Sequence, residues 1–143
     1  MSLAELAVET RVVLLLAGVV FLWALALGVL KYAQMSQSAQ AVAHPYTDIA
    51  HRAALMYSFA IALMAVFVEL SAFAGWVNLL AALVPIVFFV SAIGSYQFHG
   101  LRRDTENQFR EAPRTLGWFM LALIIGEIGG FAVLLAGFVD AWI

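Results

Sequence analysis

The sequence predicts an all-α fold: an integral membrane four-helix bundle with antiparallel helices and short loops. Of its 143 residues, 65% are hydrophobic and only 11% are charged. A soluble domain of this size needs about a quarter of its residues charged to cover its surface. The expected solvent is therefore the lipid bilayer, and four apolar segments are each long enough to cross it as a helix.

The four expected spans are residues 12–32, 53–74, 76–98 and 116–139. Helices are required because a backbone polar group cannot be left unpaired in hydrocarbon. The alternating segments of about ten residues that are typical of membrane β-strands are absent. No repeat or composition shift divides the chain, so we expect residues 1–143 to form a single transmembrane domain.

The basic residues predict how the chain is oriented. Two long polar loops, residues 33–52 and 99–115, join the first span to the second and the third to the fourth. Six basic residues lie in or beside these loops: Lys31, Arg52, Arg102, Arg103, Arg110 and Arg114. Only Arg11 lies at the other end. The positive-inside rule therefore predicts a multi-pass protein of a bacterial-type inner membrane, with both long loops cytoplasmic and both termini outside.

The first long loop contains the expected start of the second helix. Pro45 suits the first turn of a helix, and Asp48 falls in that turn, where the helix dipole favours an anion. We therefore expect the second helix to begin near Pro45, before the membrane.

Composition also excludes several function classes. The chain has no Cys, which excludes disulfides, cysteine-ligated zinc, iron–sulfur clusters and thiol catalysis. The formal net charge of −2 gives no reason to expect a nucleic-acid partner.

Glu127 lies at the midpoint of the fourth span, where an ionisable group is expensive and by default indicates function. One interpretation is a proton carrier or a counter-charge for a substrate. The other is a protonated acid hydrogen-bonded between helices, with Gly126 and Gly130 allowing close approach.

His51, at the cytoplasmic end of the second span, has three interpretations. It is an interfacial side chain bonded to a neighbouring carbonyl, an axial ligand of haem iron, or a proton acceptor. The other histidines, His44 and His99, both lie near the loops. A haem with two ligands on neighbouring helices is therefore not expected, whereas one axial ligand or a site shared between subunits is.

Tyr57 and Tyr96 each lie inside a span with a hydroxyl group that needs a partner. From the residues alone, a hydrogen bond between helices is the better explanation for each of them.

Two segments resemble styrene oxide isomerases, a family of small four-helix membrane proteins. Residues 49–59, Ile-Ala-His-Arg-Ala-Ala-Leu-Met-Tyr-Ser-Phe, resemble the segment that carries the haem-ligating histidine of the family. Residues 91–98, Ser-Ala-Ile-Gly-Ser-Tyr-Gln-Phe, resemble the segment with its active-site tyrosine. The two segments align without a gap and cover about the middle third of the chain.

This resemblance implies that haem b is bound between protomers of a trimer. Its ferric iron would act as a Lewis acid on an epoxide oxygen; the epoxide opens, a hydride shifts and a carbonyl compound forms. Carried over, His51 is the axial ligand, and Tyr96 binds or orients the oxygen of a small hydrophobic substrate. Arg52, Arg102 or Arg103 would pair with the haem propionates, although ordinary positive-inside residues explain these arginines equally well.

One departure concerns the partner of the active-site tyrosine. The family has an Asn where this chain has Tyr57, so a second catalytic position carries a bulky ring and a single hydroxyl group. We expect a smaller pocket with altered polarity, or loss of the isomerase activity.

Three hypotheses therefore compete. The leading one is a haem b-binding homo-oligomer of the styrene oxide isomerase type. The second is a non-catalytic accessory subunit of a larger membrane complex. The third is a small proton-coupled transporter that works through Glu127.

Overall fold

The computed structural model describes residues 3–110 and 112–143, and this part of the chain contains helices and no strand. A short 3₁₀ turn precedes four long helices, and together they make 83% of the described residues helical. Their bounds are η1 (Leu3–Glu5), α1 (Val8–Gln37), α2 (Pro45–Leu70), α3 (Gly75–Arg102) and α4 (Arg114–Trp142). Each long helix is apolar enough to cross a membrane. The predicted all-α four-helix bundle is confirmed.

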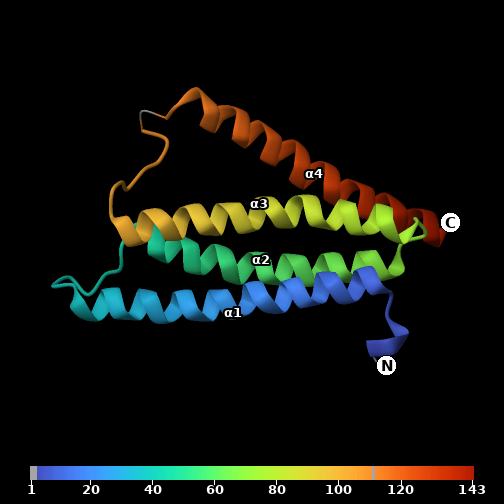
Figure 1. Cartoon of the computed structure of the whole chain (residues 1–143), viewed down its shortest axis with the longest axis horizontal. Coiled ribbons are helices and arrows are strands. Elements are labelled where there is room, and N and C mark those ends of the chain that lie inside the picture. Colours follow the sequence, from blue (N-terminus) through green and yellow to red (C-terminus); the bar gives the residue numbers. More distant parts are fainter. Residues whose placement is uncertain (1–2, 111) are drawn as a thin grey trace.

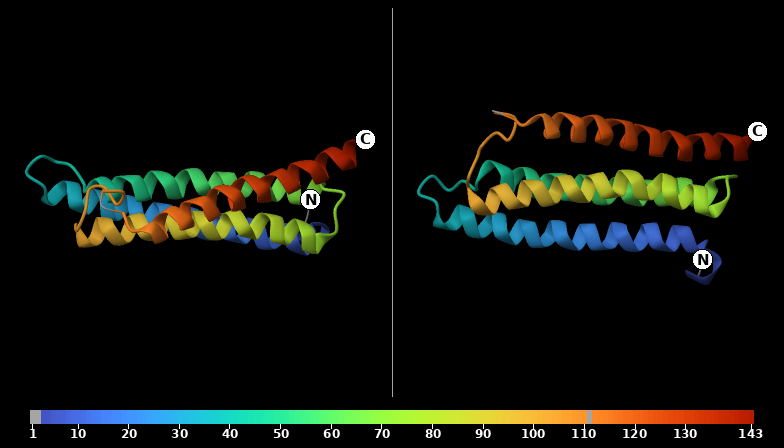
Figure 2. Two further views of the ribbon diagram at one scale, coloured as in Figure 1. Left: turned by 90° about the horizontal axis from the view of Figure 1, so that it is seen from above. Right: turned by 45° about the horizontal axis from the view of Figure 1, so that its top comes forward.

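The four helices alternate in direction, so the N- and C-termini lie at the same end of the bundle (Figure 1). α1, α2 and α3 pack together, and α4 packs on α3 and α2. α4 lies close to α3 near the C-terminus and diverges from it toward Arg114 (Figures 1 and 2). Its buried residues, Leu134 and Gly137, both belong to the close half.

The start of α2 is where the sequence predicted it. The helix begins at Pro45, and the His44 side chain caps it by accepting a hydrogen bond from the backbone N–H of Tyr46 at 3.3 Å. Asp48 lies in the first turn, next to the positive end of the helix dipole. α2 therefore begins eight residues before the predicted span.

The end of α2 differs from the predicted span 53–74, because the helix stops at Leu70. Ser71 is extended (φ −79°, ψ 138°), and its hydroxyl oxygen accepts a hydrogen bond from the N–H of Phe73 at 3.2 Å. The Asn78 amide donates to the Phe73 carbonyl at 2.9 Å. These hydrogen bonds pair polar groups of the four-residue link 71–74 between α2 and α3. The apolar residues that the sequence predicts as the end of a helix therefore form a turn.

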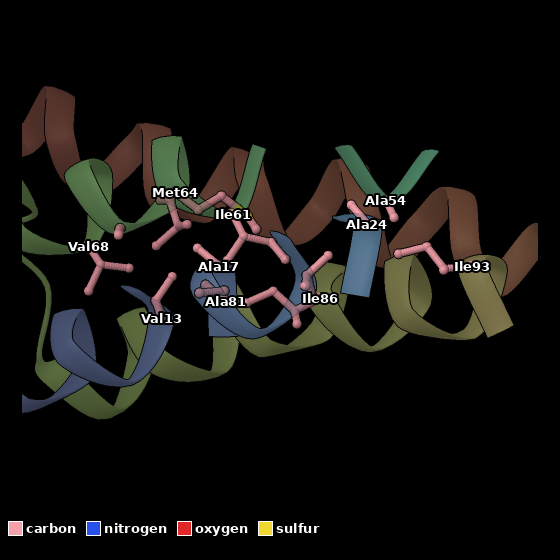
Figure 3. Close-up of a cluster of buried hydrophobic side chains, with 14 of the residues drawn as sticks. Val13, Ala17, Ala24, Ala54, Ile61, Met64, Val68, Ala81, Ile86 and Ile93 are labelled. Atoms are coloured by element: carbon pink, nitrogen blue, oxygen red, sulfur yellow. The ribbon is translucent and has the colours of Figure 1, made fainter. Parts of the chain in front are cut away.

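The core of the bundle lies between α1, α2 and α3 and is built largely from small side chains (Figure 3). In lipid, apolar burial gives little drive for helices to associate, so stability comes from close packing. Alanine allows the helix backbones to approach, and larger branched residues fill the layers between. The members include Val13, Ala17, Val20, Ala24, Leu27, Ala50, Ala54, Ile61, Ala65, Ala81, Ala82, Ile86 and Ile93.

Two carboxylates stabilise helix starts at the end of the bundle that holds the termini. Glu69 accepts a hydrogen bond from the N–H of Ala7, the N-cap residue of α1, at 3.2 Å. The Glu9 carboxylate lies against Gly75, the first residue of α3, where a side chain would collide with it. Both anions sit at positive ends of helix dipoles, and this placement gives Glu69 a structural role.

α4 is held against α3 by glycines. A Cβ atom on Gly126 would overlap the Phe88 ring, and one on Gly130 would overlap Pro85 and the Ala81 carbonyl. Pro85 has no N–H, so it leaves unfilled the helix bond that the Ala81 carbonyl would otherwise accept. Gly130 thus allows the backbone of α4 to lie against Pro85 and the Ala81 carbonyl of α3.

We predict that Gly130→Leu destabilises the bundle by about 1–3 kcal/mol, because the new side chain must push α4 away from Pro85. Gly129→Leu is the matched control, since a Cβ atom there meets nothing within 4 Å. Reversible unfolding in mixed micelles measures both. Equal stabilities of the two variants would contradict this packing.

Candidate functional site

His51 packs against α1 through the gap that a glycine leaves. Its Nδ1 lies 2.9 Å from the carbonyl oxygen of Ala24. A Cβ atom on Gly28 would lie 3.0 Å from the ring carbon Cε1, so the ring occupies the space above that glycine. Since a carbonyl only accepts, Nδ1 carries the hydrogen and donates it. Nε2 then has its lone pair free and makes no hydrogen bond within the described residues.

Asp48, one turn before His51, is the centre of a cluster of three charged side chains. Asp48 bridges α1 and α2: it lies 2.5 Å from Lys31 Nζ and 2.8 Å from Arg52 Nη2. The Arg52 side chain is 65% exposed and belongs to the same helix as Asp48, so the bond that joins the two helices is the one to Lys31. This pair fixes the level of His51 relative to Ala24.

Tyr57 and Tyr96 line one cavity of about 330 Å³ between α2 and α3. Arg52 contributes to the same wall, and the remaining lining residues, Ile49, Ala53 and Met56, are apolar. We call this cavity the tyrosine pocket. Its size lies at the small end of the range for ligand sites, and its few polar groups converge on an apolar space.

Both tyrosine rings are fixed by stacking. Tyr57 lies on the ring of Phe89, with centroids 4.2 Å apart and planes 6° from parallel. Tyr96 stacks on Tyr46 at 5.9 Å. Neither hydroxyl makes a hydrogen bond within the described residues, so a hydrogen bond between helices does not explain them.

His51 and the tyrosine pocket lie on different faces of α2. The six residues between His51 and Tyr57 correspond to about 600° of helical turn. The structure accordingly packs His51 against α1 and Tyr57 against α3. A single chain therefore does not bring the histidine and the pocket together.

Arg102 and Arg103 lie apart from both places. The Arg102 guanidinium stacks over the Phe98 ring at 5.0 Å. Arg103 ends α3 in a left-handed conformation (φ 54°). It lines a separate cavity of about 400 Å³ together with His44. Of the three arginines considered, only Arg52 borders the tyrosine pocket.

Glu127 projects from the middle of α4 toward the bundle. Its Oε1 is buried and has no hydrogen-bond partner among the described residues. Gly126 and Gly130, one on either side, make the close contact with α3 that the sequence suggested.

A polar cluster at the loop end of the bundle was missed by the sequence analysis. The Gln34 amide donates to the Gly100 carbonyl at 3.2 Å and accepts from the N–H of His44 at 3.0 Å. The N–H of Gln108 donates to the Tyr46 hydroxyl at 2.7 Å. These bonds tie both long loops to the helices. A tyrosine in the first turn of α2 was the available signal, whereas nothing local marks Gln34.

His99 forms a close pair with Asp104 just beyond the end of α3, with Nδ1 2.7 Å from Oδ1. The left-handed Arg103 reverses the chain and brings Asp104 back onto the ring. The pair lines a cavity of about 730 Å³ below the loop that joins α3 to α4. This hydrogen bond holds the pKa of Asp104 below its usual value.

Within residues 3–110 and 112–143, no three His, Asp or Glu side chains gather in a way that could hold a bare metal ion. An axial haem ligand needs only one such residue. Comparison of the chain with known protein families, with curated proteins and with solved structures found no significant match.

We predict that the stabilising effect of Asp104 depends on pH. Because its pKa is lowered in the folded chain, the effect is present above the unfolded value of about 4 and is lost as pH falls through the folded value. Asp104→Asn should therefore lower the melting temperature near neutral pH and have no effect in strong acid. Asp140→Asn, at the opposite end, is the control. A difference that grew in acid would contradict the assignment.

Proposed function

We propose that this chain is a haem b-binding protein of the membrane, with His51 as the axial ligand. The observation that carries the proposal is the state of the His51 ring. Nδ1 donates to the Ala24 carbonyl, and Nε2 has no partner. Metal-ligating histidines almost always donate their second ring N–H to a carbonyl or carboxylate, which fixes the tautomer and raises the basicity of the ligating nitrogen.

The surroundings of His51 suit an axial ligand of haem iron. The imidazole is held by α1, and the ring is partly exposed. The space above Gly28 fixes its orientation. Neutral imidazole is the common axial ligand of haem iron.

The tyrosine pocket supplies the remaining part of the proposed site. When bound, ferric haem supplies a Lewis acid for the oxygen of an epoxide. Tyr96 and Tyr57 donate hydrogen bonds to the oxygen of a small hydrophobic substrate and orient it. Ile49 and Met56 exclude water, and Arg52 at the rim pairs with a propionate. This part of the proposal follows the resemblance to styrene oxide isomerases.

A homo-oligomer follows from the two faces of α2. Because His51 lies against α1 and the pocket lies between α2 and α3, a site that contains both takes them from adjacent copies. The resemblance makes that oligomer a trimer. The proposed setting is a bacterial-type inner membrane with both long loops cytoplasmic, supported by six of the seven basic residues at that end.

The first test is the absorption spectrum of the purified protein, oxidised and then reduced with dithionite. We expect a Soret band that shifts on reduction and is lost in His51→Ala. A colourless wild-type protein from cells supplied with haem would contradict the proposal and favour the accessory-subunit hypothesis.

A matched pair of glycine variants tests the geometry of the ligand. Gly28→Val places a side chain where the His51 ring lies, so we expect weaker haem retention. Gly18→Val, on the same helix, meets nothing within 4 Å and should retain haem as the wild type does. Haem content per chain, measured by the pyridine haemochrome assay, distinguishes them. Equal loss in both variants would show that His51 is not held in this way.

Turnover of an aryl epoxide such as styrene oxide tests the catalytic part separately. Removal of one hydrogen-bond donor to a reacting oxygen typically costs about 100-fold in rate, and we expect a loss of that order in kcat for Tyr96→Phe at unchanged haem content. Tyr32→Phe, 72% exposed on α1, is the control. A haem-loaded wild type that forms no carbonyl product would refute the isomerase activity and leave haem binding intact.

A further inference from the structure

Glu127 has a carboxyl oxygen that nothing in the described chain satisfies. Its Oε1 is buried, although the residue lies in the middle of a helix that can span the membrane. An unpaired polar atom in such a place costs free energy. Buried polar atoms in native proteins are usually paired, directly or through ordered water, so a partner reached through water is the natural explanation.

The face of α4 that carries Glu127 points toward α2. Phe131 lies one turn further along the same face, and its ring packs edge-on against Phe67 of α2 at 5.2 Å. Gly126 and Gly130 face α3 at the same level. The carboxyl group is therefore directed into the groove between α4 and the α2–α3 pair, away from the lipid.

The two tyrosines of the pocket lie on α2 and α3, the helices that border this groove. The Glu127 carboxyl interacts electrostatically with the hydroxyls of Tyr57 and Tyr96, and these two hydroxyls interact with each other. α2 and α4 run in the same direction (Figure 1). From the Phe67–Phe131 contact, Tyr57 lies ten residues back and Glu127 four. By this contact about 9 Å separates them along the helix axes. Phe67 also packs against Phe138 at 5.3 Å, and by that contact the axial offset is only about 2 Å. A water molecule between the two long side chains bridges an offset in this range.

We propose that Glu127 is a positioning residue of the tyrosine pocket. Its neutral carboxyl group forms a hydrogen-bonded chain, completed by water, that runs from Glu127 to the Tyr57 hydroxyl and on to Tyr96. The chain determines where the proton of Tyr57 points and makes the pocket a donor site for an uncharged ligand with an acceptor oxygen.

The inference rests on the tyrosine pocket of the proposed function but not on haem. Tyr57 links Glu127 to Tyr96, so the coupling of the carboxyl to Tyr57 must be the stronger of the two. A purely structural Glu127, bonded only within α4 or to lipid, would be indifferent to both hydroxyls.

The test is difference infrared spectroscopy of the full-length protein in lipid, as purified, with and without ¹³C-labelled glutamate. The C=O stretching band of a protonated carboxylic acid should be present, shift in D₂O and disappear in Glu127→Gln. Glu69→Gln, at the far end of the bundle, should leave it unchanged. If Glu127→Gln does not fold, the isotope shift assigns the band to glutamate, and the tyrosine variants carry the test.

The decisive variants are the two tyrosines. Tyr57→Phe should shift the band frequency, Tyr96→Phe should shift it less, and Tyr32→Phe should leave it unchanged. Absence of the band, or a frequency that is the same in Tyr57→Phe and wild type, would overturn the proposal. Because the readout needs no haem, a colourless protein that shows the expected shifts would refute the haem hypothesis and retain the role of Glu127.

Discussion

The constraint on which the structure depends is that polar groups inside a bilayer must find partners within the protein. The backbone meets it by folding into four helices. Polar side chains form hydrogen bonds to neighbouring helices. His51 donates to the Ala24 carbonyl. The Trp23 indole N–H donates to the side-chain oxygen of Gln97 at 2.8 Å. Each such bond fixes one helix relative to another. The hydrogen bonds that pair the polar groups therefore also determine how the helices are arranged.

Small residues let the helices approach closely enough for these hydrogen bonds to form. Gly28 leaves room for an imidazole between α1 and α2, and Gly130 lets α4 meet α3 beside Pro85. Alanines such as Ala50 and Ala54 do the same in the core. Where the helices approach closely, a short polar side chain can span the interface. α4 diverges from α3 toward Arg114 (Figure 1). At that end of the bundle, Gln108 of the loop forms hydrogen bonds with Ser95 and Tyr46.

Pairing is incomplete at several polar groups. Buried oxygens of Thr10, Thr47 and Asn78 have no partner among the described residues, and neither do the groups for which function is proposed. The Nε2 atom of His51, the hydroxyls of Tyr57 and Tyr96 and one oxygen of Glu127 make no hydrogen bond in the described part of the chain. The two tyrosines are nevertheless held by stacking, and the histidine ring by a carbonyl. Groups that are fixed in place and left without partners are prepared to bind something else, which is the common physical basis of both proposals.

The sequence by itself determined the fold class, the four helices and the gathering of basic residues at one end. The length of an apolar segment and the positions of charges are local properties, and they decide which segments cross a bilayer and in which orientation. It also identified Glu127, His51 and the tyrosines, since each is expensive in lipid. It misplaced the end of α2, because Ala72 to Ala74 are as apolar as a span and only their backbone bonds reveal a turn.

Only the tertiary structure decided which of these residues share a site. It placed Arg52 with Tyr57 and Tyr96, separated Arg102 and Arg103 from them, and put His51 on the opposite face of α2. It also revealed Gln34 of α1, which joins His44 in the first long loop to Gly100 near the end of α3. Such relations depend on which faces of the helices meet. That is decided by the packing of glycines and alanines across interfaces, between residues far apart in the chain.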